Sequence, residues 1–228
     1  VTLPLTNTTA GLSHVTATVN GNSQSVSVTF VPDSGTAIIL SGALTVISDN
    51  ALANGSATDS VKAVVTDATG NLVVNQVVTF SANNGAVIAA NGTTGTDGSV
   101  TLPLTNTTAG ITRVTATVNG HSQAVEVTFI PDSSTATLLG GSLTITRDNA
   151  IANGIATNAV KAVVTDANGN LVPNQVVAFS ANHGGVIAAS GTTDADGAVN
   201  LPLTNTTTGL TRITATVNGH SQTVDVTF

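Results

Sequence analysis

The sequence predicts an all-β protein built as a row of tandem antiparallel β-sandwiches. Three observations lead to this prediction. The chain repeats itself at a long fixed period, apolar residues alternate with polar or small ones over short segments, and turn residues recur about every ten residues. No segment shows the sustained 3.6-residue periodicity and capping residues that predict a helix.

A heptapeptide that occurs three times defines the repeat. Leu-Pro-Leu-Thr-Asn-Thr-Thr begins at Leu3, Leu102 and Leu201, so both offsets are 99 residues. Solenoid repeats are 20–50 residues long, whereas about 100 residues suit an independent domain with its own core. Each repeat is therefore expected to fold as one domain.

The period divides the chain into three parts. Residues 31–129 and 130–228 are two complete repeats that differ at 28 positions. Residues 1–30 correspond to the last 30 residues of a repeat, so we predict that they form the C-terminal strands of an incomplete one. This pattern indicates a section of a longer array.

Within a repeat, strands and turns follow one another in order. Alternation predicts strands at 61–66, 75–81, 114–118 and 124–129. Asp67 to Asn71 read as a turn. Asn119-Gly120 is a strong hairpin signal because both residues accept a positive φ, and the same dipeptide begins at Asn20 and Asn218.

About seven short strands in roughly 100 residues indicate a sandwich of the immunoglobulin type, with an up-and-down barrel as the alternative. The cysteine and tryptophan core of antibody domains is missing, so Phe80, Phe129 and small aliphatic side chains must fill it. Pro103 and Pro202 lie within strand-like runs, which predicts an edge position or a bulge.

The composition excludes several functional classes. The chain has 5 basic and 12 acidic residues in 228, and it lacks Cys, Trp and Tyr. Disulfides, thiolate zinc sites and cysteine nucleophiles are therefore excluded. Five scattered cations cannot follow a phosphate backbone, so no nucleic-acid partner is expected. No apolar run reaches the roughly 18 residues that cross a bilayer, and no signal peptide opens the chain.

The recurring polar residues predict turns and exposed surface rather than chemistry. The aspartates are expected in turns or caps, with a metal site as the alternative: Asp49, Asp67, Asp97, Asp148, Asp166 and Asp196. The histidines are expected in solvated loops: His14, His121, His183 and His220. Lys62 and Lys161 are expected to face outward, with an isopeptide bond to asparagine as the alternative. We predict no catalytic residue, no metal and no cofactor.

Several motifs stand in a specific order. They are Ala53-Asn-Gly55, Val65 to Asn71, Val77-Val-Thr-Phe80, Thr96-Asp-Gly98, Leu102 to Thr108 and Val114 to Val118. In this order the chain resembles the bacterial immunoglobulin-like domain of group 1, found in the intimin and invasin family of inverse autotransporter adhesins. The resemblance covers both complete repeats and residues 1–30. Val74 departs from the family pattern, which often has proline there, whereas Pro173 keeps it.

The resemblance implies a role at the surface of a Gram-negative bacterium. In this family an N-terminal β-barrel in the outer membrane exports a row of such domains, and the outermost one contacts a host receptor or another cell. The chain would then be a non-enzymatic section of the stalk. Its membrane anchoring and its contact with a host cell-surface protein would both depend on domains outside this chain.

A binding module that contacts a host protein or neighbouring bacteria directly is the alternative. It predicts a distinctive exposed patch on one repeat. The two repeats differ at positions that look scattered in the sequence, such as Ser48 against Arg147 and Ser56 against Ile155. The scatter favours the stalk.

The segments that join one repeat to the next are the candidate functional residues. They are Val31, Pro32, Asp33, Ile130, Pro131 and Asp132. Proline restricts itself and the residue before it, so we predict a short, semi-rigid joint with Val31 or Ile130 packed at the boundary. Repeats joined in this way would form an extended rod of about 35–45 Å per repeat.

Residues 1–30 would leave a hairpin without its second sheet. A lone hairpin is only marginally stable in water. We therefore expect its apolar face to pair with another molecule or with residues outside this chain.

Overall fold

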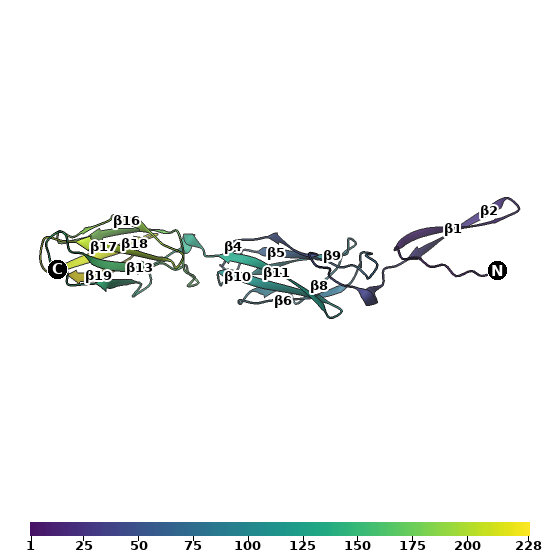
Figure 1. The fold of residues 1–228 in the computed structure, drawn as a ribbon, viewed down its shortest axis with the longest axis horizontal. Coiled ribbons are helices and arrows are strands. Elements are labelled where there is room, and N and C mark those ends of the chain that lie inside the picture. The colour runs from purple at the N-terminus through teal and green to yellow at the C-terminus, as the bar shows by residue number, and fades with distance from the viewer. The chain divides into compact units, whose positions relative to one another are not determined.

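The computed structural model describes residues 1–228, and apart from two 3-10 turns its regular secondary structure is antiparallel β (Figure 1). It divides into two compact units. The first comprises Val1–Ala51, Ala57–Asn106 and Gly110–Phe129. The second comprises Ile130–Phe228 together with two short loops from earlier in the chain, Leu52–Ser56 and Thr107–Ala109. The three-part division by sequence stays a prediction.

The first unit contains a hairpin and a sandwich. The hairpin is β1 (Gly11–Val19) and β2 (Asn22–Phe30), and a 3-10 turn, η1 (Ser34–Thr36), follows it. The sandwich strands are β3 (Leu44–Ser48), β4 (Ala51–Leu52), β5 (Asp59–Val64), β6 (Val77–Ala82), β7 (Val87–Ile88), β8 (Asn91–Thr93), β9 (Ser99–Thr105), β10 (Gly110–Val118) and β11 (His121–Ile130). They form two sheets, in the orders β3-β5-β9-β7 and β4-β11-β10-β6-β8.

The second unit repeats this sandwich. After η2 (Ser133–Thr135) come β12 (Leu143–Arg147), β13 (Asn158–Val163), β14 (Val176–Ala181), β15 (Val186–Ile187), β16 (Ser190–Thr192), β17 (Ala198–Thr204), β18 (Leu210–Val217) and β19 (His220–Thr227). Its two sheets have the orders β12-β13-β17-β15 and β16-β14-β18-β19. The predicted tandem immunoglobulin-like sandwiches are confirmed. The strands outnumber the seven expected, because the sandwiches also contain very short strands. β7, β8, β15 and β16 are only two or three residues long.

Alternating side chains build the core between the two sheets of each sandwich. In β5 and β13 every second residue is buried, which matches the pleat of a strand with one face in the core. The second core contains residues from both sheets, including Val160, Leu203, Val177 and Ile213. Phe80 and Phe129 are buried as predicted.

The Asn-Gly dipeptides form two-residue hairpin turns as predicted. Asn119 and Gly120 have φ of 47° and 81°, and Val118 pairs with His121 across the turn. Positive φ at both positions is the geometry that matches the twist of the two flanking strands.

Pro103 and Pro202 lie in strands, not in bulges. Pro103 pairs with Ser60 of β5 on one side of β9. On the other side, β7 pairs only with Leu104 and Thr105, so Pro103 lies where that side of β9 has no neighbour. The expectation of a local edge is confirmed.

The hairpin β1–β2 has no second sheet in this chain. Its strands pair only with each other. Val15 and Val28 are each 37% exposed, whereas the equivalent Val114 and Val127 of the complete repeat are fully buried. The apolar face is therefore open, and its pairing with another molecule stays a prediction.

Candidate functional site: the repeated asparagine turn

A carboxylate organises the turn that follows β5. Oδ1 of Asp67 accepts hydrogen bonds from the backbone N–H groups of Thr69 and Asn71, both at 2.9 Å. Oδ2 accepts from Nδ2 of Asn71, also at 2.9 Å. Gly70, with φ of 88°, closes the turn. The hydrogen bond from the Asn71 side chain, followed by those from Thr69 and the backbone, holds the pKa of Asp67 well below its usual range.

The same turn recurs after β13 in the second unit. Asp166 accepts from the N–H groups of Asn168 and Asn170 at 2.9 Å each. Its other oxygen accepts from Nδ2 of Asn170 at 2.9 Å. Both aspartates are nearly fully buried, so each turn is a fixed part of its sandwich.

The predicted linker residues are bonded to these turns. The N–H of Asp33 donates to Oδ2 of Asp67, and the N–H of Asp132 donates to Oδ2 of Asp166, both at 3.1 Å. Each linker aspartate also caps the following 3-10 turn with its side chain. The expected packing of the apolar linker residues is wrong, because Val31 is 79% exposed and Ile130 is 38% exposed. Polar bonds, not apolar packing, hold the linkers.

The asparagine side chain of each turn also reaches chain segments far away in the sequence. In the first unit, Nδ2 of Asn71 donates to the carbonyl of Thr8 at 2.9 Å, and Oδ1 accepts from the N–H of Ala10 at 2.9 Å. In the second unit, Nδ2 of Asn170 donates to Thr107 at 3.0 Å, and Oδ1 accepts from Ala109 at 2.8 Å. We call this arrangement the asparagine clamp.

Two further bonds reinforce the clamp of the second unit. Nδ2 of Asn168 donates to the carbonyl of Ala53 at 2.9 Å, and the N–H of Ala53 donates to the carbonyl of Ile130 at 2.7 Å. Ala53 is fully buried. In the turn of the first unit Thr69 stands where Asn168 stands in the second, so this bond is specific to the second unit.

A side-chain amide that uses both its donor and its acceptor holds the bonded chain segment in one orientation. It cannot rotate by half a turn about its last bond without losing both bonds, because its oxygen and nitrogen would exchange places. It has no acid, base or nucleophile. The clamp can therefore position chain segments, and it offers no reaction.

The other aspartates stand where turns and caps were expected. Asp97 accepts from the N–H and hydroxyl of Ser99 at 3.1 and 2.6 Å. Asp49 accepts from the N–H of Thr128 at 2.6 Å, so it also binds the edge of β11. No group of three or more histidine, aspartate or glutamate side chains lies close enough to hold a metal ion.

All four histidines are exposed as expected, but only His183 lies in a loop. The expectation of loops is wrong for the other three, because His14 lies within β1, 3.0 Å from the hydroxyl of Ser27, and His121 and His220 begin β11 and β19. Lys62 lies on the outer face of β5, and its Nζ is 3.6 Å from Asp97 in a partly exposed ion pair. Its side chain faces away from the core.

Sequence reasoning missed Asp59, a buried carboxyl at the start of β5. Both of its oxygens lie close to the N–H of Ala51, at 3.1 and 3.2 Å. Burial raises the pKa of Asp59, the bond from Ala51 lowers it, and the nearby Asp49 carboxylate raises it again. The sequence contained a signal for this burial. Asp59 lies two and four residues before Val61 and Ala63, so it points to the same inward face of the strand.

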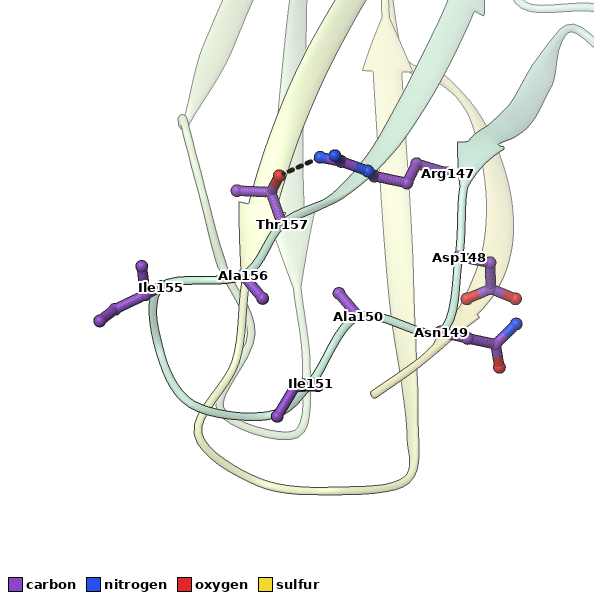
Figure 2. A pocket seen from close by; sticks show the side chains of 8 residues that line it. All are labelled: Arg147, Asp148, Asn149, Ala150, Ile151, Ile155, Ala156 and Thr157. Carbon is purple, nitrogen blue, oxygen red and sulfur yellow. Dashed lines mark hydrogen bonds between the residues drawn. The ribbon is translucent and has the colours of Figure 1, made fainter.

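A hollow of about 460 Å³ lies at one end of the second sandwich (Figure 2). Its lining includes Arg147, Ile151 and Ile155, and the guanidinium of Arg147 donates to the hydroxyl of Thr157 at 2.7 Å. The first repeat has Ser48, Leu52 and Ser56 at the same positions. The interpretation of these differences as scattered is wrong, because the fold brings them together.

The geometry therefore defines a class of protein: tandem immunoglobulin-like sandwiches whose turns bear polar clamps. Residues 41–130 and 140–228 match the bacterial Ig-like domain (group 1). The chain belongs to this family, which confirms the resemblance seen in the sequence. No helix in the structure has the length and apolarity required to span a bilayer.

One relative is the inverse autotransporter adhesin YeeJ of Escherichia coli (strain K12). It is 34% identical over 244 residues, and the alignment covers 98% of this chain and 10% of YeeJ. The chain thus spans a tenth of the length of this relative. The match places the chain among relatives of inverse autotransporter adhesins.

Two solved structures share the fold over most of the chain. InvD of Yersinia pseudotuberculosis has a TM-score of 0.61 at 15% identity, covering 96% of this chain and 77% of InvD. The Escherichia coli adhesin FdeC has a TM-score of 0.54 at 22% identity, covering 96% of this chain and 74% of FdeC.

Proposed function

We propose that this chain is a spacer segment in the stalk of a bacterial surface adhesin. Its repeats hold a distal adhesive domain away from the outer membrane. Membership of the group 1 family and the adhesin relative support this role. In this proposal the chain has no enzymatic activity, and anchoring in the membrane and contact with a host protein both depend on domains outside it.

The asparagine clamp is the observation that carries the proposal. The same two hydrogen bonds, at nearly the same lengths, occur at Asn71 and at Asn170, one repeat length apart. A spacer has to resist bending at every joint, and a Gly/Ser-rich tether would behave as a flexible coil. A clamp that recurs with the repeat serves that purpose at each joint.

The linkers support the same function. Proline restricts the backbone at Pro32 and Pro131. The following Asp33 and Asp132 are each bonded to the turn that bears the clamp. Each joint is thus short and polar, and the aspartate that it bonds to lies in a buried turn. The extended rod and its semi-rigid joints are part of this proposal.

Distance measurements between spin labels test the stiffness of the joint. One label is placed in β6 and one in β14. We expect a narrow distance distribution that broadens in the double variant Asn71→Ala, Asn170→Ala. Asn91→Ala and Asn200→Ala are the matched controls, because these exposed asparagines make no side-chain hydrogen bond. An equally broad distribution in the unchanged chain contradicts the proposal.

Binding to host cells and matrix proteins tests the spacer role itself. We expect the chain 1–228 not to bind, whereas the protein that includes its native C-terminal domain binds. Binding of 1–228 at a comparable level would overturn the spacer function.

A direct binding module is the second candidate, and the hollow favours it. Arg147 and Ile155 give one repeat an exposed surface that the other lacks, and arginine is enriched at binding hot spots. The double variant Arg147→Ser, Ile155→Ser restores the residues of the first repeat. Loss of cell binding in this variant would support the second candidate.

A further inference from the structure

We propose that the end loops 151–155 and 206–208 form a docking face for the Asp-x-x-Gly-Asn turn of another bacterial Ig-like repeat. The inference deepens the spacer function and rests on it.

The second unit shows how such loops are used. There the loops Leu52–Ser56 and Thr107–Ala109 receive the turn at Asp166. The carbonyl of Ala53 accepts from Asn168. The carbonyl of Thr107 and the N–H of Ala109 both bond to Asn170. Two carbonyls and one N–H of these loops thus form hydrogen bonds with the asparagine side chains of one turn.

The end loops have the same shape as these two loops. Gly55 and Gly154 have φ of 78° and 73°. A Cβ added at Gly55 would lie 3.1 Å from Cγ2 of Thr107, and one added at Gly154 would lie 3.1 Å from Cγ2 of Thr206. The two loop pairs therefore pack together in the same way, so the docking face is already formed in the chain.

The corresponding backbone groups in the end loops are unbonded. The carbonyls of Ala152 and Thr206 and the N–H of Thr208 make no hydrogen bond within the chain. Only the carbonyl of Thr208 has a neighbour, Nε2 of His183 at 3.3 Å. Ala152 is partly exposed, whereas the equivalent Ala53 is fully buried. The end loops thus offer the groups that Asn168 and Asn170 bind elsewhere in the chain.

Apolar surface lies beside these polar groups. Ile151 is 74% exposed, whereas the equivalent Leu52, which belongs to the second compact unit, is partly buried. Figure 2 shows Ile151 on the loop below Ala150. An incoming turn would satisfy the polar groups and cover part of this apolar surface, which favours a folded repeat over a small ligand.

The test extends the chain by a second copy of residues 130–228 after Phe228. The new junction repeats the native Phe129–Ile130 sequence. NMR hydrogen exchange then follows the N–H of Thr208, with the N–H of Ala109 as the internal reference. We expect exchange at Thr208 to slow by about tenfold or more toward that of Ala109, because a bonded amide exchanges only on opening.

The matched control is Asn170→Ala in the added copy. It should return Thr208 to fast exchange and leave Ala109 and the strands of the added copy protected. Fast exchange at Thr208 in the extended chain, with the added copy folded, would overturn the docking face. Slow exchange at Thr208 in 1–228 that persists on dilution would also overturn it, because no further repeat would then be needed to bond this N–H. Neither result would change the outcome of the host-cell binding test, so failure of the spacer function remains distinguishable.

Discussion

Asp59 and Asn158 occupy the same position in the two repeats. Asn158 accepts from the N–H of Ala150 at 2.9 Å and donates from Nδ2 to the carbonyl of Thr227 at 2.8 Å. Ionised Asp59 cannot donate, and it stands near a second carboxylate, that of Asp49. The amide thus satisfies its buried site, whereas the ionised carboxyl does so only in part.

We expect Asp59→Asn to stabilise the first complete repeat at neutral pH. The pKa of Asp59 is raised in the folded state, so its contribution to stability is fully present below its ordinary value of 3.8 and is lost as pH rises through the raised pKa. The stabilisation by Asp59→Asn should therefore shrink as pH falls toward 4. Urea titrations followed by NMR resonances of each repeat measure this effect.

The reciprocal variant Asn158→Asp is the control. It should destabilise the second repeat at neutral pH and leave the first unchanged. The low pKa of Asp67 acts in the opposite direction, because its stabilisation is present above the ordinary value and is lost only as pH falls below it. An Asp59→Asn effect that does not vary between pH 7 and 4 would contradict the assignment of charge burial as its cause.

At the scale of single elements, the edge strands approach the opposite sheet closely at a glycine. A Cβ added at Gly191 of β16 would lie 2.5 Å from Cγ2 of Val199 in β17. Overpacking of a core contact costs about 1–3 kcal/mol, and we expect Gly191→Ala to destabilise the second repeat by that amount. Chemical denaturation measures it. Gly140→Ala, which points into open space, should have almost no effect.

The hairpin β10–β11 is tied to the 3-10 turn η1 by its turn asparagine. Nδ2 of Asn119 donates to the carbonyls of Ser34 at 2.9 Å and Ala37 at 3.2 Å. Asn119→Gly keeps the positive φ and removes these bonds, so we expect a loss of about 1–2 kcal/mol. Asn119→Asp should cost more at neutral pH, because it turns a carboxylate toward the carbonyls. Equal losses in both variants would contradict this view.

The strands that could be predicted from the sequence are those long enough to show alternation. The alternation places β5, β6, β10 and β11 to within a few residues, and the assignment of Phe80 and Phe129 to the core is confirmed. β7 has only two residues, and no periodic pattern can be seen over that length. Such short strands form only because a neighbouring strand pairs with them, so they depend on tertiary structure and not on the local sequence.

At the scale of the whole molecule, the 99-residue repeat predicted the tandem sandwiches but not the partners of the asparagine clamp. The Asp-x-x-Gly-Asn motif could be predicted as a turn, because its residues bond to their own backbone. The partners of Asn71 lie 61 and 63 residues earlier, and no local rule connects them. The role of the linkers as joints stays a prediction, and Val31 was misleading, because an apolar residue beside proline suggested packing where the structure has polar bonds.

Repetition also supplies an internal comparison of one hairpin with and without its second sheet. β1–β2 has the same nine-residue register as β10–β11. In β10–β11 the apolar side chains pack against a core, whereas those of β1–β2 are open. A lone hairpin is marginally stable. In a dilute solution of the chain 1–228, where no second molecule covers this face, we therefore expect amides of β1–β2 to exchange almost as fast as in an unfolded chain, while those of β10–β11 exchange only on opening of the repeat. Hydrogen exchange with residue resolution measures both in one sample. Comparable protection in β1–β2 would mean that a second molecule covers its apolar face, and dilution would then remove the protection.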